Sequence, residues 1–130
     1  MEAPGIWDEE FLVNTVTTGA QYSPVISALA NGRFAIAYTD FSRSGLDGFT
    51  DFSDTAIRVQ VFGSDGAAWS ETVQVNTATS YRQDAPRMAP LADGGFVIAY
   101  TDHSMGWDSD GIRLAFGSET GDCGVVDIRA

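Results

Sequence analysis

The feature that most constrains this chain is an internal repeat with a spacing of 62 residues. Sixteen of the thirty positions from 13 to 42 carry the same residue 62 positions later, and the longest shared run is Ile36–Asp40, which returns as Ile98–Asp102. Identical residues at identical spacing indicate one structural unit built twice. We therefore expect the two copies to fold alike.

The two copies differ in length at one place. After Ser42 the sequences diverge, and they align again at Ile57–Arg58 and Ile112–Arg113, where the offset has fallen to 55 residues. Such variation in length is typical of a surface loop. We expect a single all-β domain over 1–130, with repeat one at 9–70 and repeat two at 71–130.

The first half of each copy predicts a β-hairpin. Strands are expected at 25–30 and 33–39, joined by Asn31-Gly32, because both residues of this dipeptide tolerate the positive φ of a tight hairpin turn. Asp93-Gly94 precedes the equivalent strand at 95–101. Aromatic and branched residues alternate there with Ala or Val, which predicts a second strand covered on both faces.

Two further strands complete each predicted unit. The third, Ile57–Phe62, alternates apolar and polar residues and is expected to be half exposed. The fourth, Thr72–Asn76, has its counterpart at the start of the chain in Phe11–Asn14. No segment shows helical periodicity, so helix is expected to be nearly absent.

Repeated four-stranded units of this size favour propeller blades. The runs Phe11–Thr15 and Gly94–Asp102 also resemble tandem β-propeller-type repeats of large secreted, calcium-associated bacterial proteins of the RTX type. That resemblance implies a location outside the cell or on its surface and an association with Ca²⁺. This chain departs from those repeats at Tyr38 and Tyr100, where they commonly carry Trp.

Two blades are too few to close a propeller ring, so apolar faces must be covered by something else. One solution is a homo-oligomer in which Phe11–Asn14 completes the last blade of a neighbouring copy. In a second solution Val125–Arg129 is the fourth strand of the last blade and the N-terminal segment pairs elsewhere. Two further solutions are a fragment of a longer array and a single-chain β-sandwich.

The charge of the chain excludes two classes of partner. Its 18 acidic and 7 basic residues give a formal charge of -11, which repels nucleic acid and anionic membranes. The excess of carboxylates suits cations instead, Ca²⁺ among them. Cys123 is the one cysteine, so no disulfide can form within the chain.

Function is expected on the edge that carries the long loops, because the opposite edge has only tight turns. The predicted ligand is a carbohydrate or a similar polar small molecule, since an aromatic ring can stack on a sugar while Asp and Asn accept hydrogen bonds from its hydroxyls. Trp69 offers a second such ring. The candidate ligand-binding residues are Trp107, His103, Asp108, Asp47, Phe49, Arg58 and Arg113.

Several carboxylates near glycines could also supply oxygen ligands for Ca²⁺. The candidate metal ligands are Asp40, Asp47, Asp102, Asp108 and Asp110. Asp40 and Asp102 have a structural alternative, because an Asp at the end of a strand commonly bonds to nearby groups of the fold. Arg58 and Arg113 are their predicted partners, since all four recur at equivalent points.

Three functions follow in order of preference. The first is a non-catalytic, lectin-like binding module, and the second is a structural repeat of a secreted or surface adhesin-like protein. The third is a small glycan hydrolase in which acids such as Asp47 and Asp108 act as acid and base. Catalysis is the least favoured, because His103 has no duplicate and no known catalytic motif is present.

Overall fold

The computed structural model describes residues 11–14, 19–41, 55–76, 82–103, 111–118 and 123–126. In this part of the chain every regular element is a β-strand except one short 3₁₀ turn at Ala30–Gly32. The prediction of an all-β chain is therefore confirmed. Because the described strands form two separate open sheets, they close neither a barrel nor a propeller ring.

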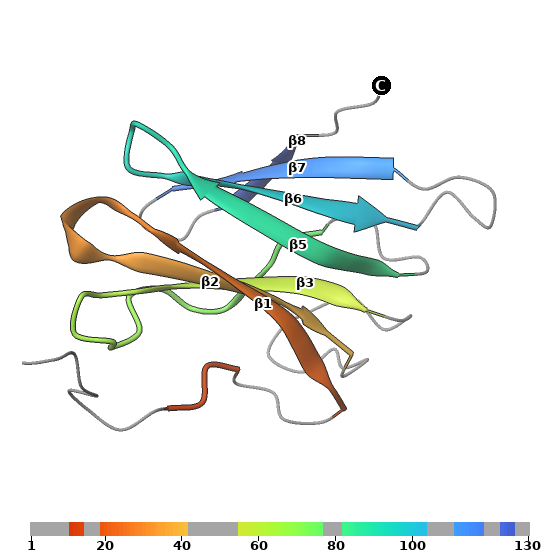
Figure 1. Cartoon of the computed structure of the whole chain (residues 1–130), viewed down its shortest axis with the longest axis horizontal. Coiled ribbons are helices and arrows are strands. Elements are labelled where there is room, and N and C mark those ends of the chain that lie inside the picture. The colour runs from red at the N-terminus through yellow and green to blue at the C-terminus, as the bar shows by residue number, and fades with distance from the viewer. Residues whose placement is uncertain are drawn as a thin grey trace, which may run out of the picture.

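The strands form two antiparallel sheets of four, each in simple sequential order (Figure 1). The first sheet contains β1 (Gln21–Ala28), β2 (Phe34–Asp40), β3 (Ala56–Phe62) and β4 (Val73–Gln74). The second sheet contains β5 (Gln83–Pro90), β6 (Phe96–Asp102), β7 (Gly111–Gly117) and β8 (Cys123–Val126). The fourth strand of the first sheet comes from the segment that opens the second repeat in the sequence.

The two sheets reproduce each other in detail, as the repeat predicts. The pairing shifts register between Tyr22 and Val25 in β1 and between Asp84 and Arg87 in β5. The equivalent residues Ser23 and Ala85 both have positive φ, 54° and 56°. A bulge at the same place in both copies bends the first strand of each sheet in the same way.

The hairpin turns confirm the prediction for the first copy and differ in the second. Asn31 and Gly32 both have positive φ, as a tight turn of this type requires. In the second copy only Gly94 does, and the amide of Gly94 donates to the carbonyl of Leu91. Asp93 instead accepts a hydrogen bond from the amide of Gly95. The two turns therefore reverse the chain by different backbone routes.

One face of each sheet forms the shared core. Alternate residues of β2 and β3 in the first sheet pack against alternate residues of β6 and β7 in the second, with Met88 of β5 beside them. The principal members of this core are Ala35, Ala37, Ile57, Val59, Val61, Phe96, Ile98, Tyr100 and Ala115. Two layers packed face to face are compatible with a β-sandwich as well as with stacked blades.

The third strand of the first copy is buried along its whole length, so the prediction of a half-exposed strand is wrong. The polar side chains of β3 are covered and bonded instead of solvated. Gln60 donates to the carbonyl of Ser70 and accepts a hydrogen bond from the hydroxyl of Thr72. Because these bonds replace those to water, the polar face of β3 can be buried.

The second strands also depart from their prediction. In β6 the side chains of Phe96, Ile98 and Tyr100 are buried while those of Val97 and Ala99 are half-buried. The strand is therefore fully covered on one face only. Burial within this chain therefore does not explain why Val97 and Ala99, on the other face of β6, are apolar.

The fourth strand of the second copy is formed within the chain. β8 pairs with β7, with Val126 opposite Leu114 and Cys123 opposite Gly117. This pairing favours the second of the two solutions for the last strand, in which a C-terminal segment completes the last sheet. Phe11–Asn14 has no ladder pairing, so its prediction as a strand is wrong for the single copy.

Candidate functional site

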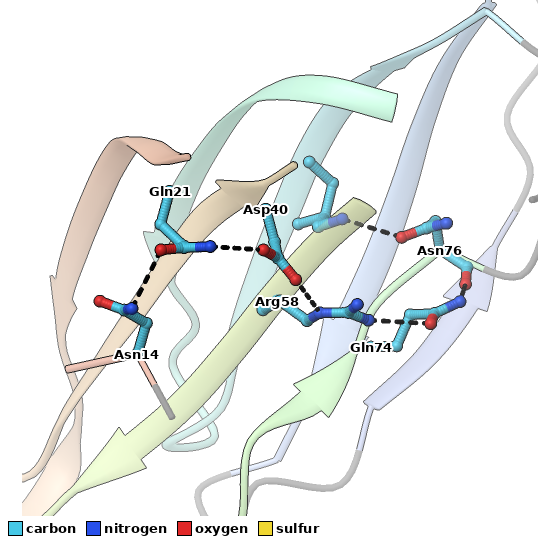
Figure 2. A network of polar contacts seen from close by, with 7 residues as sticks. Asn14, Gln21, Asp40, Arg58, Gln74 and Asn76 are labelled. Carbon is cyan, nitrogen blue, oxygen red and sulfur yellow. Dashed lines mark hydrogen bonds and ion pairs between the residues drawn. The ribbon is translucent and has the colours of Figure 1, made fainter. Parts of the chain in front are cut away.

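A chain of buried polar contacts crosses the first sheet (Figure 2). Asp40, the last residue of β2, accepts a hydrogen bond from Gln21 Nε2 on Oδ1 at 2.9 Å. Its Oδ2 accepts one from Arg58 Nε at 3.0 Å, which makes an ion pair between two almost fully buried side chains. Asn14 Nδ2 donates to Gln21 Oε1 at 3.1 Å.

The same contacts recur in the second sheet. Asp102 accepts from Gln83 Nε2 at 2.9 Å on Oδ1 and from Arg113 Nε on Oδ2. Asn76 Nδ2 donates to Gln83 Oε1 at 3.3 Å, as Asn14 does to Gln21. The prediction that the two arginines are the partners of the two aspartates is confirmed in both copies.

Asn76 links the two sheets. Its Oδ1 accepts a hydrogen bond from the backbone amide of Ile57 in β3 at 2.9 Å, while its amide nitrogen donates to Gln83 of β5. Thr55 reinforces the connection, because its hydroxyl donates to the carbonyl of Gln83 and its own carbonyl accepts from the Gln83 amide. Backbone and side-chain bonds therefore fix β5 to the first sheet.

The first network continues to the edge of its sheet. Arg58 Nη1 donates to Gln74 Oε1 at 2.8 Å, and Gln74 Nε2 donates to the Asn76 carbonyl at 2.9 Å (Figure 2). Arg58 is opposite Gln74 in the β3–β4 pairing. The guanidinium thus joins three strands through one planar group, which suits Arg better than Lys.

This network neutralises charge within the fold. Each aspartate uses one oxygen for an Arg and the other for a Gln, and both carboxylates are buried. Arg113 is the least covered of the four charged side chains, with 14% exposed. Carboxylates held in this way are suited to bracing the ends of β2 and β6, where the chain turns into the long loops.

Tyr38 lies beside the first ion pair and has a perturbed pKa. Burial of its phenol and the nearby Asp40 carboxylate raise the pKa of Tyr38 from 10.0 to about 12, with Arg58 opposing the change. Both causes disfavour the phenolate. A phenol with a raised pKa binds its proton more tightly in the folded chain than in the unfolded chain.

We predict that the folded state loses stability between pH 10 and pH 12 through this phenol. Below pH 10 the Tyr38 phenol is protonated in both states, whereas at higher pH the unfolded state releases the proton first and is favoured. Urea unfolding across this range measures the decline. Tyr38→Phe should remove that part of the pH dependence, and an unchanged slope in this variant would contradict the assignment.

His103 forms a contact that the sequence did not predict. Its ring nitrogen Nε2 lies 3.3 Å from Asp84 Oδ1, and both side chains are about one fifth exposed. The backbone amide of His103 donates to the carbonyl of Arg82, as Phe41 does to Ala20 in the first copy. This candidate ligand-binding residue therefore lies at the base of the second long loop.

Five of the predicted site residues lie outside the described part of the chain, namely Asp47, Phe49, Trp107, Asp108 and Asp110. Their roles stay predictions. Within the described ranges, no three or more His, Cys, Asp or Glu residues lie together in a way that could hold a metal ion. The structure brings Asp40 to Arg58 and Asp102 to Arg113.

Sequence reasoning missed the amide side chains of the network. The repeat aligns Gln21 with Gln83 and Asn14 with Asn76, yet these identities had no predicted role. The available signal was a set of polar residues retained in both copies among apolar neighbours. Trp69, a suggested sugar-stacking residue, has the Arg33 guanidinium 3.8 Å from the centre of its ring.

Comparison with known proteins identifies no matching family, curated protein or solved structure. Among the described residues there is also no helix with the length and apolar character needed to cross a membrane.

Proposed function

We propose that this chain is a non-catalytic structural repeat module, two propeller-type blades of a secreted or surface protein of the adhesin kind. One observation carries the proposal. The charged residues that recur in both copies, Asp40 with Arg58 and Asp102 with Arg113, are engaged with each other inside the fold. We infer that these charged residues recur in both copies because they stabilise the fold.

The arrangement of the strands supports the description as blades. Each unit is a four-stranded antiparallel sheet in sequential order, and the two units stack with β5 of the second against the first. The sequence resemblance to tandem blade repeats agrees with this topology. In a module of this type each added sheet lengthens the stack, and the exposed faces at the two ends of the stack contact neighbouring modules.

The lectin-like function is a second candidate, favoured by the anchoring of the long loops. The hydrogen bonds from Phe41 to Ala20 and from His103 to Arg82 fix the start of each loop at an equivalent place. A loop whose first residue is held by such a hydrogen bond can present a ligand-binding site with a defined geometry. Trp107 and Phe49 would stack on a sugar, and Asp47, Asp108 and Asp110 would hold Ca²⁺.

A glycan array and titration calorimetry distinguish the two functions. For the structural module we expect no glycan above background, no heat on adding CaCl₂, and the same thermal midpoint in CaCl₂ and in EDTA. Saturable glycan binding that is lost in Trp107→Ala, or Ca²⁺ binding that is lost in Asp108→Asn, would overturn the structural proposal. Trp69→Ala separates the two suggested stacking rings, because Trp69 lies outside the long loops.

A further inference from the structure

The contact between the two sheets uses non-equivalent faces of the repeat. In the first sheet the core face carries Ala35 and Ala37 of β2, whereas in the second it carries Phe96 and Ile98 of β6. Since the repeat aligns Phe34 with Phe96, the core face of the second sheet corresponds to the outer face of the first. The two units are therefore stacked head to tail.

The outer face of the second sheet corresponds, in the same way, to the core face of the first. Its side chains lie at the positions of buried residues but are accessible. Ile112 of β7 is 58% exposed where its equivalent Ile57 is 0% exposed, and Phe116 is 41% exposed where Val61 is 0% exposed. Val97, Ala99 and Leu114 complete this apolar surface.

The outer face of the first sheet is the other half of the same contact. Ile26 is 65% exposed although its equivalent, Met88, packs on the core. Phe34 and Ile36 are half-buried where Phe96 and Ile98 are completely buried. Each end of the two-sheet stack thus presents one half of an interface that exists complete in the middle.

The segment Phe11–Asn14 lies on the outer face of the first sheet. The ring of Phe11 contacts that of Phe62 with centroids 5.9 Å apart, and Figure 1 shows this segment on the side of the first sheet away from the second. Asn14 bonds Gln21 as Asn76 bonds Gln83. The segment therefore has the place on the first sheet that 73–76 has on the second.

The segment 73–76 shows what such a strand does in the complete interface. It belongs to the edge of the preceding sheet, because the Val75 amide donates to the Ile57 carbonyl and the Ile57 amide donates to Asn76. In the second sheet β8 has this edge position, with Val126 opposite Leu114, the residue equivalent to Val59.

We propose that a second copy of this chain docks head to tail on the first. The outer face of its second sheet covers the outer face of the first sheet, while β8 of that copy remains the last strand of its second sheet. The proposal rests on the blade-like module proposed above. The occupant is a second copy because the interface within the chain already joins the equivalents of these two faces.

The match is partial, because Gln60 stands in the first sheet where Ala115 stands in the second, and the ends of β3 and β7 also differ. Phe62 stands in the first sheet where Gly117 stands in the second, and Phe62 stacks on Phe34 with ring centroids 5.4 Å apart. Phe11 already covers Phe62. A head-to-tail contact between unlike faces can continue from copy to copy, so the assembly is a closed ring or a filament and not a two-fold dimer.

Light scattering and sedimentation velocity on the full chain test this assembly. We expect a mass that rises with protein concentration to a multiple of 13.9 kDa. Ile26→Lys and Ile112→Lys each place a charge on one of the two faces at an exposed position, so each variant alone should remain monomeric and folded. Glu71→Lys, at an exposed position between β3 and β4, is the control and should assemble like the unmodified chain.

Mixing the two variants gives the decisive result. Each retains the face that the other has lost, so an equimolar mixture should form a heterodimer and grow no further. A monomer at every concentration of the unmodified chain, or a mixture that stays monomeric while the unmodified chain assembles, would overturn the docking. Glycan or Ca²⁺ binding would contradict the proposed structural function but not the docking. Failure to assemble would contradict the docking but not the structural function.

Discussion

Asp40→Ala is expected to lower the free energy of unfolding by about 3–5 kcal/mol, because it removes the Asp40 carboxylate from the buried Arg58 guanidinium. Only 1% of the Arg58 side chain is exposed, so water cannot replace the lost carboxylate without opening the sheet. Gln21 loses its acceptor in the same change. Urea unfolding followed by circular dichroism measures the loss.

Two controls separate the buried charge from the loss of any carboxylate. Asp84→Ala removes an acid paired with His103 at partial exposure, and we expect a cost of about 1 kcal/mol or less. Asp40→Leu combined with Arg58→Met removes both charges and should recover much of the stability. A loss of equal size in Asp40→Ala and Asp84→Ala would show that burial of the pair is not what stabilises the fold.

Gly117→Ala is expected to destabilise the chain by about 1–3 kcal/mol through overpacking. A Cβ at this position would lie less than 3.0 Å from Cζ, Cε1 and Cε2 of Phe96, well inside contact distance. Phe96 is completely buried between the sheets and has little freedom to move. Thermal unfolding of the purified variant measures the effect.

A second variant tests whether the Phe96 ring is the cause. Phe96→Leu makes room for the added methyl group, so Gly117→Ala should cost less in a Phe96→Leu background than in the unmodified chain. Gly63→Ala is the matched control at the end of β3, since the closest atom there is an oxygen of the Asp65 side chain at 3.1 Å. Equal costs at Gly63 and Gly117 would contradict the explanation.

The sequence predicted the candidate network in part. The recurrence of Asp and Arg at equivalent positions was sufficient to pair Asp40 with Arg58 and Asp102 with Arg113, because a charge retained in two copies of a β unit needs a partner in each. The glutamines and asparagines were not placed. Their role depends on hydrogen bonds between segments distant in sequence, such as Asn76 with Ile57.

The burial of β3 could not be predicted from its own sequence. In β3 apolar residues alternate with polar ones, a pattern typical of a strand with one solvent-exposed face. The apolar residues are Ile57, Val59 and Val61, and the polar ones are Arg58 and Gln60. In the fold, Gln74, Ser70 and the Asp40 carboxylate satisfy the polar side chains. The local pattern shows which residues are polar. Whether a polar residue can be buried depends on hydrogen-bond partners from other strands, which the pattern does not show.

By itself the sequence determined the repeat, the all-β class, the first three strands of each copy and the pairing of aspartate with arginine. These follow from local pattern and from identity between the two copies. Only the tertiary structure decided which face of each sheet is buried. Both copies carry mainly apolar residues on both faces of β2 and β6, so burial depends on the neighbour, and each sheet has a neighbouring sheet on one side only in the part of the chain that the structure describes.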